Sequence, residues 1–360
     1  MTVTTLPTTQ TAVVARKGHY AIVANAPIPP LEPDSILIRT EAVAINPVDL
    51  NTVTNFDYDG TTGGFDVAGT VVAVGREVDN GLHEGDRVGA TVHGMNSLRP
   101  ADGAFAQYVV TPADLAIKIP ADTPIESAAT LPVGVGTVGL ALRSLGLDSA
   151  TTTSPNKALV LVHGGSTATG TLAIQFLRHA GHRPIATSSP ANFDLVRGAG
   201  AEEVFDYRSP TCTADVRAYT RNSLRFVLDC VSETTAMEFS YACIGRAGGR
   251  YTALHPFSSR VAASRPTVKA DWVFQPALFG RDVAWPAPFG RPGDPELRQF
   301  AKRFYRQAQE LLEKGELRPH PISLSSHGFP GVLAAVDRLR QGGVSGIKLV
   351  CRISHAESHV

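Results

Sequence analysis

Residues 159 to 171 read Leu159-Val160-Leu161-Val162-His163-Gly164-Gly165-Ser166-Thr167-Ala168-Thr169-Gly170-Thr171. An apolar, β-branched run ends at two glycines and an apolar helical period follows, which predicts a strand, a tight turn and a helix. Such a turn directs the free N–H groups of a helix N-terminus at an anion, most often a pyrophosphate. Thr167 and Ala168 stand where a dinucleotide fingerprint has glycines, so an ordinary strand-to-helix turn is the alternative.

The chain beyond residue 157 alternates between short apolar runs and amphipathic stretches. This alternation is typical of a parallel sheet with helices on both faces. We expect strands at 158–163, 184–187, 203–206, 225–229 and 249–254, and helices at 171–180 and 191–199.

The first third of the chain is β-rich, because short apolar runs are separated by glycine, proline and aspartate. It predicts a small barrel or sandwich with strands at 35–40, 42–45, 69–75, 86–92 and 106–110. Residues 132–145 have helical spacing, and the polar stretch 148–156 predicts a surface loop.

One later segment lacks periodicity. Six prolines and both tryptophans fall within residues 256–294, which predicts an ordered but irregular insertion. An amphipathic helix is expected at 295–314, with Glu296 in its first turn and Gly315 after its end. The tail 333–353 predicts a helix, a glycine turn and a final strand.

Composition limits the class of protein. The 360 residues are enough for about two domains, and 43% hydrophobic with 18% charged residues is typical of a soluble globular enzyme. A net charge of +0 argues against nucleic-acid or polybasic membrane binding. We expect neither a membrane-spanning helix nor a secretory signal. Four cysteines without a C-x-x-C pair predict a reducing, cytoplasmic compartment, no disulfide framework and no structural zinc.

Four motifs carry a family resemblance: Asn46-Pro47-Val48-Asp49, Asp66-Val67-Ala68-Gly69-Thr70-Val71, Glu84-Gly85-Asp86-Arg87-Val88 and Gly103-Ala104-Phe105-Ala106-Gln107-Tyr108. In their order and spacing, the chain resembles the quinone oxidoreductase branch of the medium-chain dehydrogenases/reductases. Residues 164–169, 188–194, 200–207 and 285–293 are similar to one subgroup, the trans-acting enoyl reductases of fungal polyketide pathways, of the lovastatin type.

The resemblance implies an α/β chain of two domains. Residues 1–133 and 316–360 would form a GroES-like β-barrel catalytic domain. Residues 134–315 would form a Rossmann domain that binds NADPH on a doubly wound parallel sheet, with the proline-rich insertion 256–294. The active site would lie in the crevice at the switch point of that sheet. Relatives dimerise through an edge strand where the insertion lies, and because proline cannot donate to a sheet ladder, we expect a monomer.

The resemblance also implies which residues bind the cofactor. The phosphates would meet the turn, and the ribose would meet the segment after the second strand together with a tyrosine. The nicotinamide end would meet two further pairs of residues and the N-P-x-D region. In that order these residues are Ser166, Thr167, Ala168 and Thr169; Ser189, Pro190, Ala191, Asn192 and Tyr207; Leu254, His255, Val344 and Ser345; and Val48, Asp49, Leu50 and Asn51.

NADPH is favoured over NADH by the residue types near the ribose. NAD enzymes place a carboxylate there, which would repel a 2′-phosphate. Here hydroxyls and an amide precede a helix that carries Arg197, and the serines can serve equally as helix caps. Tyr207 could instead be a half-buried aromatic at a strand end. His255 could act as a proton donor, although a lone histidine is more often structural.

The resemblance places an apolar acyl substrate against two segments. These comprise Val138, Gly139, Leu140, Ala141, Leu142, Arg143, Ser144 and Leu145, and Phe274, Gln275, Pro276, Ala277 and Leu278. Plain core is the alternative for the first of them, because core and acyl pocket share a composition. Zinc is not expected, since no cysteine precedes Cys212 and Asn46-Pro47-Val48-Asp49 occupies the ligand region of the zinc-dependent relatives.

The implied reaction is conjugate reduction, with an enolate oxygen stabilised by a hydrogen-bond donor and a proton delivered to the α-carbon. The subgroup carries a lysine shortly after N-P-x-D, and here Asn51 takes that position. An amide can donate a hydrogen bond but cannot supply a proton near pH 7. Asn51 and Thr137 are therefore the catalytic candidates, with Thr137 or water assisting proton transfer.

The implied substrate is an α,β-unsaturated thioester on the carrier domain of a highly reducing polyketide synthase or a synthase–peptide synthetase hybrid. A free-standing quinone or enone reductase is one alternative. Asn51 motivates another, a redox-silent cyclase, isomerase or accessory protein on the same scaffold.

Overall fold

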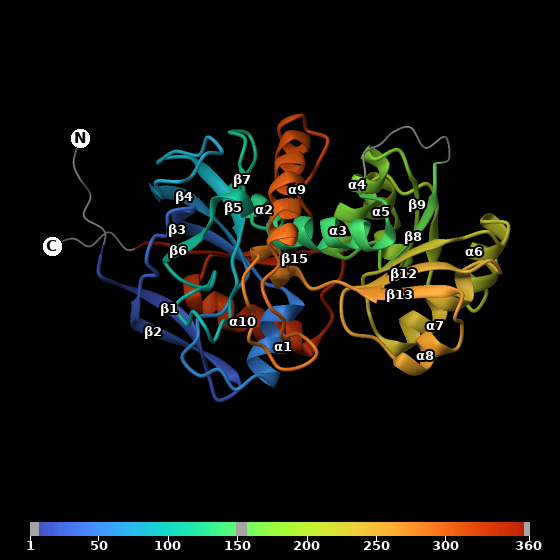
Figure 1. Cartoon of the computed structure of the whole chain (residues 1–360), viewed down its shortest axis with the longest axis horizontal. Helices are drawn as coiled ribbons and strands as arrows, with labels where there is room; N and C mark the ends of the chain where they lie inside the picture. Colours follow the sequence, from blue (N-terminus) through green and yellow to red (C-terminus); the bar gives the residue numbers. More distant parts are fainter. Residues whose placement is uncertain (1–6, 149–156, 356–360) are drawn as a thin grey trace. The chain divides into compact units, whose positions relative to one another are not determined.

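The structure, a computed structural model, describes residues 7–148 and 157–355. All but the first residue of the loop expected at 148–156 lies outside these ranges. The chain forms two compact units (Figure 1). Unit 1 comprises Met1–Val133, Pro276–Gly315 and Pro319–Val360, and unit 2 comprises Gly134–Gln275 and Glu316–Arg318.

Unit 1 is built on a seven-stranded sheet in the order β14-β15-β3-β4-β5-β7, with β6 paired to β3 and a separate β1-β2 hairpin. Its core consists mainly of small aliphatic side chains such as Ile36, Ile38, Val67 and Val88, all fully buried. The elements are β1 (Thr9–Arg16), β2 (His19–Pro27), β3 (Ser35–Ala44), α1 (Pro47–Asn55), β4 (Asp66–Val74), β5 (Arg87–Thr91), β6 (Tyr108–Pro112), β7 (Ala116–Lys118), α2 (Ile125–Ala128), α9 (Pro295–Glu313), β14 (Ile322–Ser325), α10 (Gly328–Gln341) and β15 (Lys348–Arg352).

The end of the chain joins the sheet formed by its beginning. β15 pairs antiparallel with β3, where Val350 lies opposite Ala44 and Cys351 opposite Val43. Residues from opposite ends of the sequence thereby lie side by side. This pairing places β15 next to the end of β3, directly before the N-terminus of α1.

The division into units differs from the expected domains, because Pro276–Gly315 packs with unit 1. Three contacts account for this. The Trp285 indole donates to the Met95 carbonyl at 2.9 Å, the Tyr305 hydroxyl donates to the Pro132 carbonyl at 2.7 Å, and Arg298 pairs with Asp114 at 3.1 Å.

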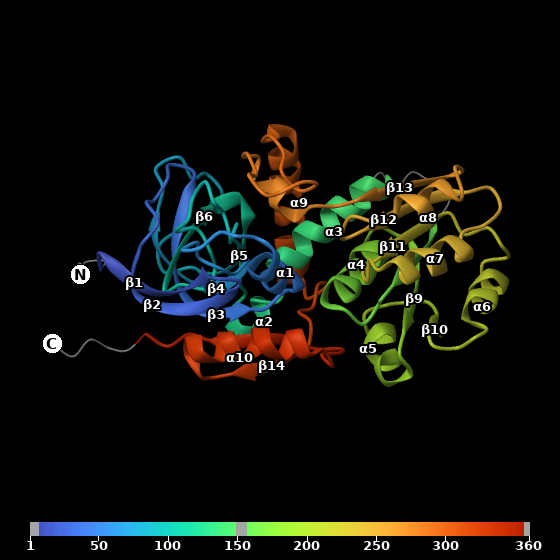
Figure 2. The same cartoon turned by 90° about the horizontal axis from the view of Figure 1, so that it is seen from below.

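Unit 2 contains a six-stranded parallel sheet in the order β10-β9-β8-β11-β12-β13. Chain order reverses between β8 and β11, which is the doubly wound arrangement predicted from the alternating pattern. Helices α4 and α5 cover one face, and α6, α7 and α8 cover the other (Figure 2). The elements are α3 (Pro132–Leu145, entered from unit 1), β8 (Leu159–His163), α4 (Ala168–His179), β9 (Arg183–Ser188), α5 (Phe193–Gly198), β10 (Val204–Asp206), α6 (Cys212–Tyr219), β11 (Phe226–Asp229), α7 (Thr234–Cys243), β12 (Gly249–Ala253), α8 (Ser259–Ala263) and β13 (Val268–Trp272).

The proline-rich segment 256–294 is more regular than expected. Helix α8 and strand β13 lie within it, and β13 is the edge strand of the parallel sheet, paired with β12 from Val268 to Trp272. Prolines 266 and 276 flank this strand without interrupting it, so the ladder hydrogen bonds form.

One helical run bears on the expectation that no helix spans a membrane. Among the residues that the structure describes, Ile125–Leu145 is long and apolar enough to cross a bilayer. Yet 83% of its most apolar window is buried inside the protein, as in the core helix of a globular domain.

Candidate active site

The turn after β8 is shaped by close approach of backbone to backbone. Gly164 has φ +78°, a conformation that glycine adopts without strain. A Cβ atom at Gly170 would clash with the carbonyl oxygen of Gly164, and one at Gly165 would lie 2.7 Å from the Ala186 side chain. These glycines therefore let α4 begin directly against the carboxyl end of the sheet, where His163 and Asp229 are register partners at the switch point.

Thr167, which stands where a dinucleotide fingerprint has a glycine, caps helix α4. Its hydroxyl accepts from the Gly170 N–H and donates to the Gly164 carbonyl, both at 2.9 Å. The Thr167 N–H also bonds Gly164, at 3.0 Å. The hydroxyl expected to face the cofactor is thus engaged within the turn. The N–H groups of Ala168 and Thr169 lie in the first helical turn, where no intrahelical acceptor exists.

The ends of β9 and β10 bring the ribose-site candidates together. The Tyr207 N–H bonds the Ser188 carbonyl at 3.4 Å, and Asn192 donates to the Ser189 hydroxyl at 3.3 Å. Pro190 and Ala191 lie between them in a short 3-10 turn, with exposed side chains. Serine, not a carboxylate, ends β9.

Arg208 is a residue that the sequence analysis missed in this cluster. Its guanidinium lies 5.3 Å from the centre of the exposed Tyr207 ring, and its Nε donates to the Tyr207 hydroxyl at 3.2 Å. Arg197, which we had considered, stacks on Phe193 and pairs with Glu203 at 3.7 Å. The sequence feature that could have identified Arg208 is its position directly after a tyrosine at the end of a strand.

Beyond β11 and β12, Asp229 organises the loops. Its carboxylate is fully buried and accepts the Val231 and Ser232 N–H groups and the Tyr251 hydroxyl, at 2.9, 3.0 and 2.7 Å. The Ser232 hydroxyl in turn accepts the Leu254 N–H at 2.8 Å. This fixes the backbone at Leu254 and His255. Burial lowers the pKa of His255, which favours its neutral form.

In unit 1, helix α1 carries the N-P-x-D candidates. Asn46 is its N-cap, and the Asn46 N–H donates to the Asp49 carboxylate at 2.6 Å in a capping box. Asp49 is fully buried, and burial raises its pKa well above the usual value. Asn51 is half-buried, and its side-chain amide has no hydrogen-bond partner among the described residues. Val48 and Leu50, on either side of Asp49, are also half-buried.

Lys348 is the second residue that sequence analysis missed. From β15, its buried ammonium donates to Asn46 at 2.7 Å and to Asp66 at 2.6 Å. Asn46 itself donates to Asp66 at 2.9 Å, and Asp66 also accepts the Val133 N–H at 2.8 Å. This network fixes the start of α1. The signal was a lysine within the apolar run of the final strand.

The remaining candidates occupy less distinctive places. Thr137 is buried on α3. Val344 and Ser345 lie in the loop between α10 and β15, where Val344 packs on the core of unit 1 and Ser345 is exposed.

The expected acyl-pocket residues are mostly buried. On α3, Val138, Gly139, Leu140, Ala141, Leu142 and Leu145 are buried and Arg143 is exposed. The Ser144 hydroxyl bonds Asp271 at 2.8 Å. The second segment, Phe274, Gln275, Pro276, Ala277 and Leu278, is also buried, and the boundary between the units falls within it.

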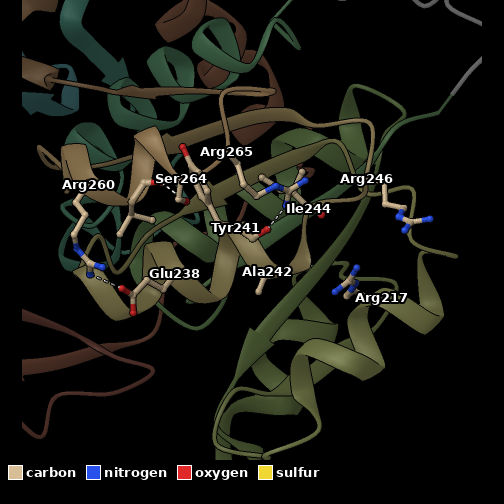
Figure 3. A pocket seen from close by; sticks show the side chains of 10 residues that line it. Arg217, Glu238, Tyr241, Ala242, Ile244, Arg246, Arg260, Ser264 and Arg265 are labelled. Atoms are coloured by element: carbon tan, nitrogen blue, oxygen red, sulfur yellow. Dashed lines mark hydrogen bonds and ion pairs between the residues drawn. The ribbon is translucent and has the colours of Figure 1, made fainter.

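A separate hollow of about 680 Å³ opens on unit 2 among α6, α7 and α8 (Figure 3). Arg217, Arg246, Arg260 and Arg265 line it, and none of the predicted site residues does. Arg265 donates to three carbonyls at the end of α7, and Arg260 pairs with Glu238 at 2.8 Å. The hollow is therefore not part of the candidate site.

Comparisons with known proteins identify the family of the chain. Two family profiles match, an alcohol dehydrogenase GroES-like domain at residues 32–121 and a zinc-binding dehydrogenase at 168–254. The trans-enoyl reductase FSL5 of Gibberella zeae is 48% identical, covering 97% of this chain and 99% of that protein. The enoyl reductase component lovC of the lovastatin nonaketide synthase of Aspergillus terreus is 44% identical, covering 96% and 97%.

The chain belongs to the trans-enoyl reductases. Solved structures share the fold of this trans-enoyl reductase at lower identity. An alcohol dehydrogenase superfamily protein from Novosphingobium aromaticivorans has a TM-score of 0.75 at 23% identity, covering 96% of this chain and all of that one. The CurK enoyl reductase has a TM-score of 0.71 at 18% identity, covering 96% and 100%.

One of the two matching family profiles is named for zinc binding. Within residues 7–148 and 157–355, no group of three or more histidine, cysteine, aspartate or glutamate side chains is placed to hold a metal ion. The four cysteines are free thiols.

Proposed function

We propose that this trans-enoyl reductase reduces the α,β-double bond of a thioester tethered to the carrier domain of a highly reducing polyketide synthase or a synthase–peptide synthetase hybrid. The setting is cytoplasmic fungal secondary metabolism, which four free thiols suit. The observation that carries the proposal is a sequence identity of 44–48% with trans-enoyl reductases over nearly the full chain.

The residues present fit a nicotinamide cofactor. Glycines clear space at the start of α4. The N–H groups of Ala168 and Thr169, in the first turn of this helix, would donate to a phosphate of the cofactor. Ser166 begins this cradle, and Thr167 holds it in shape. Ser189, Asn192, Tyr207 and Arg208 would hold the ribose, and the absence of a carboxylate at the end of β9 supports NADPH rather than NADH.

The bound cofactor supplies a hydride to the β-carbon of the substrate. The chain contributes binding, orientation and charge stabilisation. The Asn51 side-chain amide has no hydrogen-bond partner within residues 7–148 and 157–355, so it is available to donate a hydrogen bond to the thioester oxygen as negative charge develops there. The Lys348–Asn46–Asp66 network holds the start of the helix that carries Asn51. Thr137 is assigned to proton delivery, with water.

The test is NADPH oxidation with an enoyl thioester, first crotonyl pantetheine and then a synthase whose own reductase domain is inactive. We expect turnover that requires the thioester and yields the saturated product by mass. A small quinone without carrier protein is the control for a free-standing quinone reductase. No oxidation of NADPH with any thioester in the presence of the cognate synthase contradicts the proposal.

Asn51 supports a second candidate function, that of a protein that binds the cofactor without using it. An amide cannot replace the proton-donating lysine of the subgroup. In that case Asn51→Lys creates turnover in an otherwise silent protein, whereas in the leading proposal the wild-type chain is active and Asn51→Lys changes mainly the pH profile of kcat. Isothermal titration with NADPH, alongside the kinetic assay, separates binding from turnover.

A further inference from the structure

Unit 1 contains a small cavity of about 180 Å³ that the preceding site does not use. Its apolar lining includes Val92, just after β5, Val110 on β6 and Phe279. A protein cavity of roughly 150 Å³ holds a molecule the size of benzene, so this one accommodates a compact organic fragment. Phe279 directly follows the segment 274–278, which is expected to contact the acyl chain.

The charged groups at the cavity are matched with one another. Arg99 pairs with Asp102 at 2.7 Å and with Glu32 at 2.6 Å, and Arg281 pairs with Glu32 at 2.5 Å. Asp282 accepts the Gly293 N–H at 2.8 Å. Because each charge has a protein partner, the cavity does not call for a charged ligand.

His93 presents a defined hydrogen-bond donor. The Asn96 side-chain oxygen accepts the Leu98 N–H at 3.1 Å, which orients the amide so that its nitrogen faces His93 Nδ1 at 3.3 Å. An amide nitrogen only donates, so Nδ1 must be the acceptor and the ring proton must lie on Nε2. Burial, with a further contribution from Arg99, lowers the pKa of His93 to about 3, so the ring is neutral at physiological pH.

The Nε2–H group of His93 is left unmatched. The residue is 4% exposed, it lines the cavity, and its Nε2 has no hydrogen-bond partner among the described residues. The Phe279 and Trp285 rings, each 5.6 Å away by ring centres, hold the imidazole in place. A buried donor without an acceptor is destabilising, and a ligand oxygen would satisfy it.

We propose that this cavity binds a neutral, compact fragment through a carbonyl or hydroxyl oxygen that accepts from His93 Nε2–H. Resting on the proposed function, the fragment is an oxygen-bearing part of the acyl chain that lies beyond the reacting double bond. The cavity would then make the enzyme select acyl chains that carry this oxygen over chains that lack it. Val92, Val110 and Phe279 supply its apolar walls.

A binding experiment tests the site without turnover. The full chain, with 15N-labelled histidine, is titrated with cyclopentanone and, as a shape-matched control, with cyclopentane. We expect the His93 signals of the wild type to show the Nε2–H tautomer and a saturable shift with cyclopentanone alone. Binding of cyclopentanone, followed in the variants by isothermal titration, should be lost in His93→Phe and partly retained in His93→Gln, which keeps a donor. Thermal unfolding verifies that both variants fold. No saturable shift, meaning that the site holds water only, overturns the proposal.

A kinetic experiment tests the link to the substrate. It compares 2-hexenoyl pantetheine with its 5-oxo analogue. We expect wild-type kcat/KM to favour the oxo substrate by about tenfold, the value of one recovered hydrogen bond. His93→Phe should abolish this preference and leave the hexenoyl rate within twofold. Equal losses on both substrates overturn the selective role. If neither substrate is reduced but cyclopentanone still binds, the proposed function fails and the site stands.

Discussion

At the scale of single residues, Arg208 offers a direct test of cofactor choice. Its guanidinium stacks on Tyr207 and carries no ion pair among the described residues. If it contacts the 2′-phosphate, Arg208→Ala removes a charged hydrogen bond worth about 1.5–3 kcal/mol. We expect KM for NADPH to rise roughly 10- to 100-fold, while KM for NADH stays unchanged, as measured by steady-state kinetics with both cofactors.

Arg197→Ala is the matched control, because Arg197 already pairs with Glu203 and stacks on Phe193. It should leave the NADPH/NADH ratio within about twofold, since exposed pairs contribute little. A loss of NADPH preference in the Arg197 variant, with none in the Arg208 variant, would reverse the assignment.

Two buried histidines predict how stability depends on pH. Burial lowers the pKa of His93 to about 3 and that of His320 to about 4. In the unfolded chain both take up protons below about pH 6.5, whereas in the folded chain they stay neutral. Stability is therefore full above pH 6.5 and falls as pH drops toward 4, by up to about 1.4 kcal/mol per pH unit for each residue.

Urea unfolding at pH 7.0, 6.0 and 5.0 measures this effect. As pH falls, the unfolding free energy of wild type should decrease more than that of His320→Phe. His19→Phe, at an exposed position on β2, should show a constant difference. If the difference in unfolding free energy from wild type depended on pH in the same way for both variants, burial of His320 would not account for the loss of stability in acid.

At the scale of elements, Thr167 connects helix α4 to the turn that precedes it. Its hydroxyl caps the helix by accepting from Gly170 at 2.9 Å. Thr167→Ala should lower the unfolding free energy by about 1 kcal/mol and weaken NADPH binding, because the cradle loses its brace. Thr167→Ser keeps the hydroxyl and should restore both. Thermal unfolding and NADPH titration give the two readouts, and a binding loss equal in the serine variant would contradict the capping role.

The elements differed in how well sequence predicted them. Periodicity located five of the six strands of unit 2 and helix α9 to within a few residues, because each buries a regular apolar face. Helix α1 was not predicted: only Thr52, Val53 and Asp49 along it are buried, which leaves no apolar stripe. Strand β13 was masked by the prolines around it, although its own five residues contain none.

The candidate site could be predicted only in part. Local motifs pointed to the turn at Gly164 and to Asn51. Lys348 could not be assigned, because its partners Asn46 and Asp66 lie some 300 residues away and meet it only through the pairing of β15 with β3. His93 was overlooked for a similar reason, since its role depends on the orientation of Asn96 and on burial by Phe279.

At the scale of the whole molecule, the edge strand β13 bears on the oligomeric state. The expected reason for a monomer, prolines in the edge, does not apply, because β13 itself contains no proline. Another reason does: Lys269 and Asp271 are exposed along this strand. Charged side chains on an edge oppose pairing with a second sheet. We therefore expect a mass near 38.1 kDa in light scattering. Lys269→Val with Asp271→Val should shift the mass toward a dimer, whereas a wild-type dimer disrupted by Lys269→Pro would show that this edge is the interface.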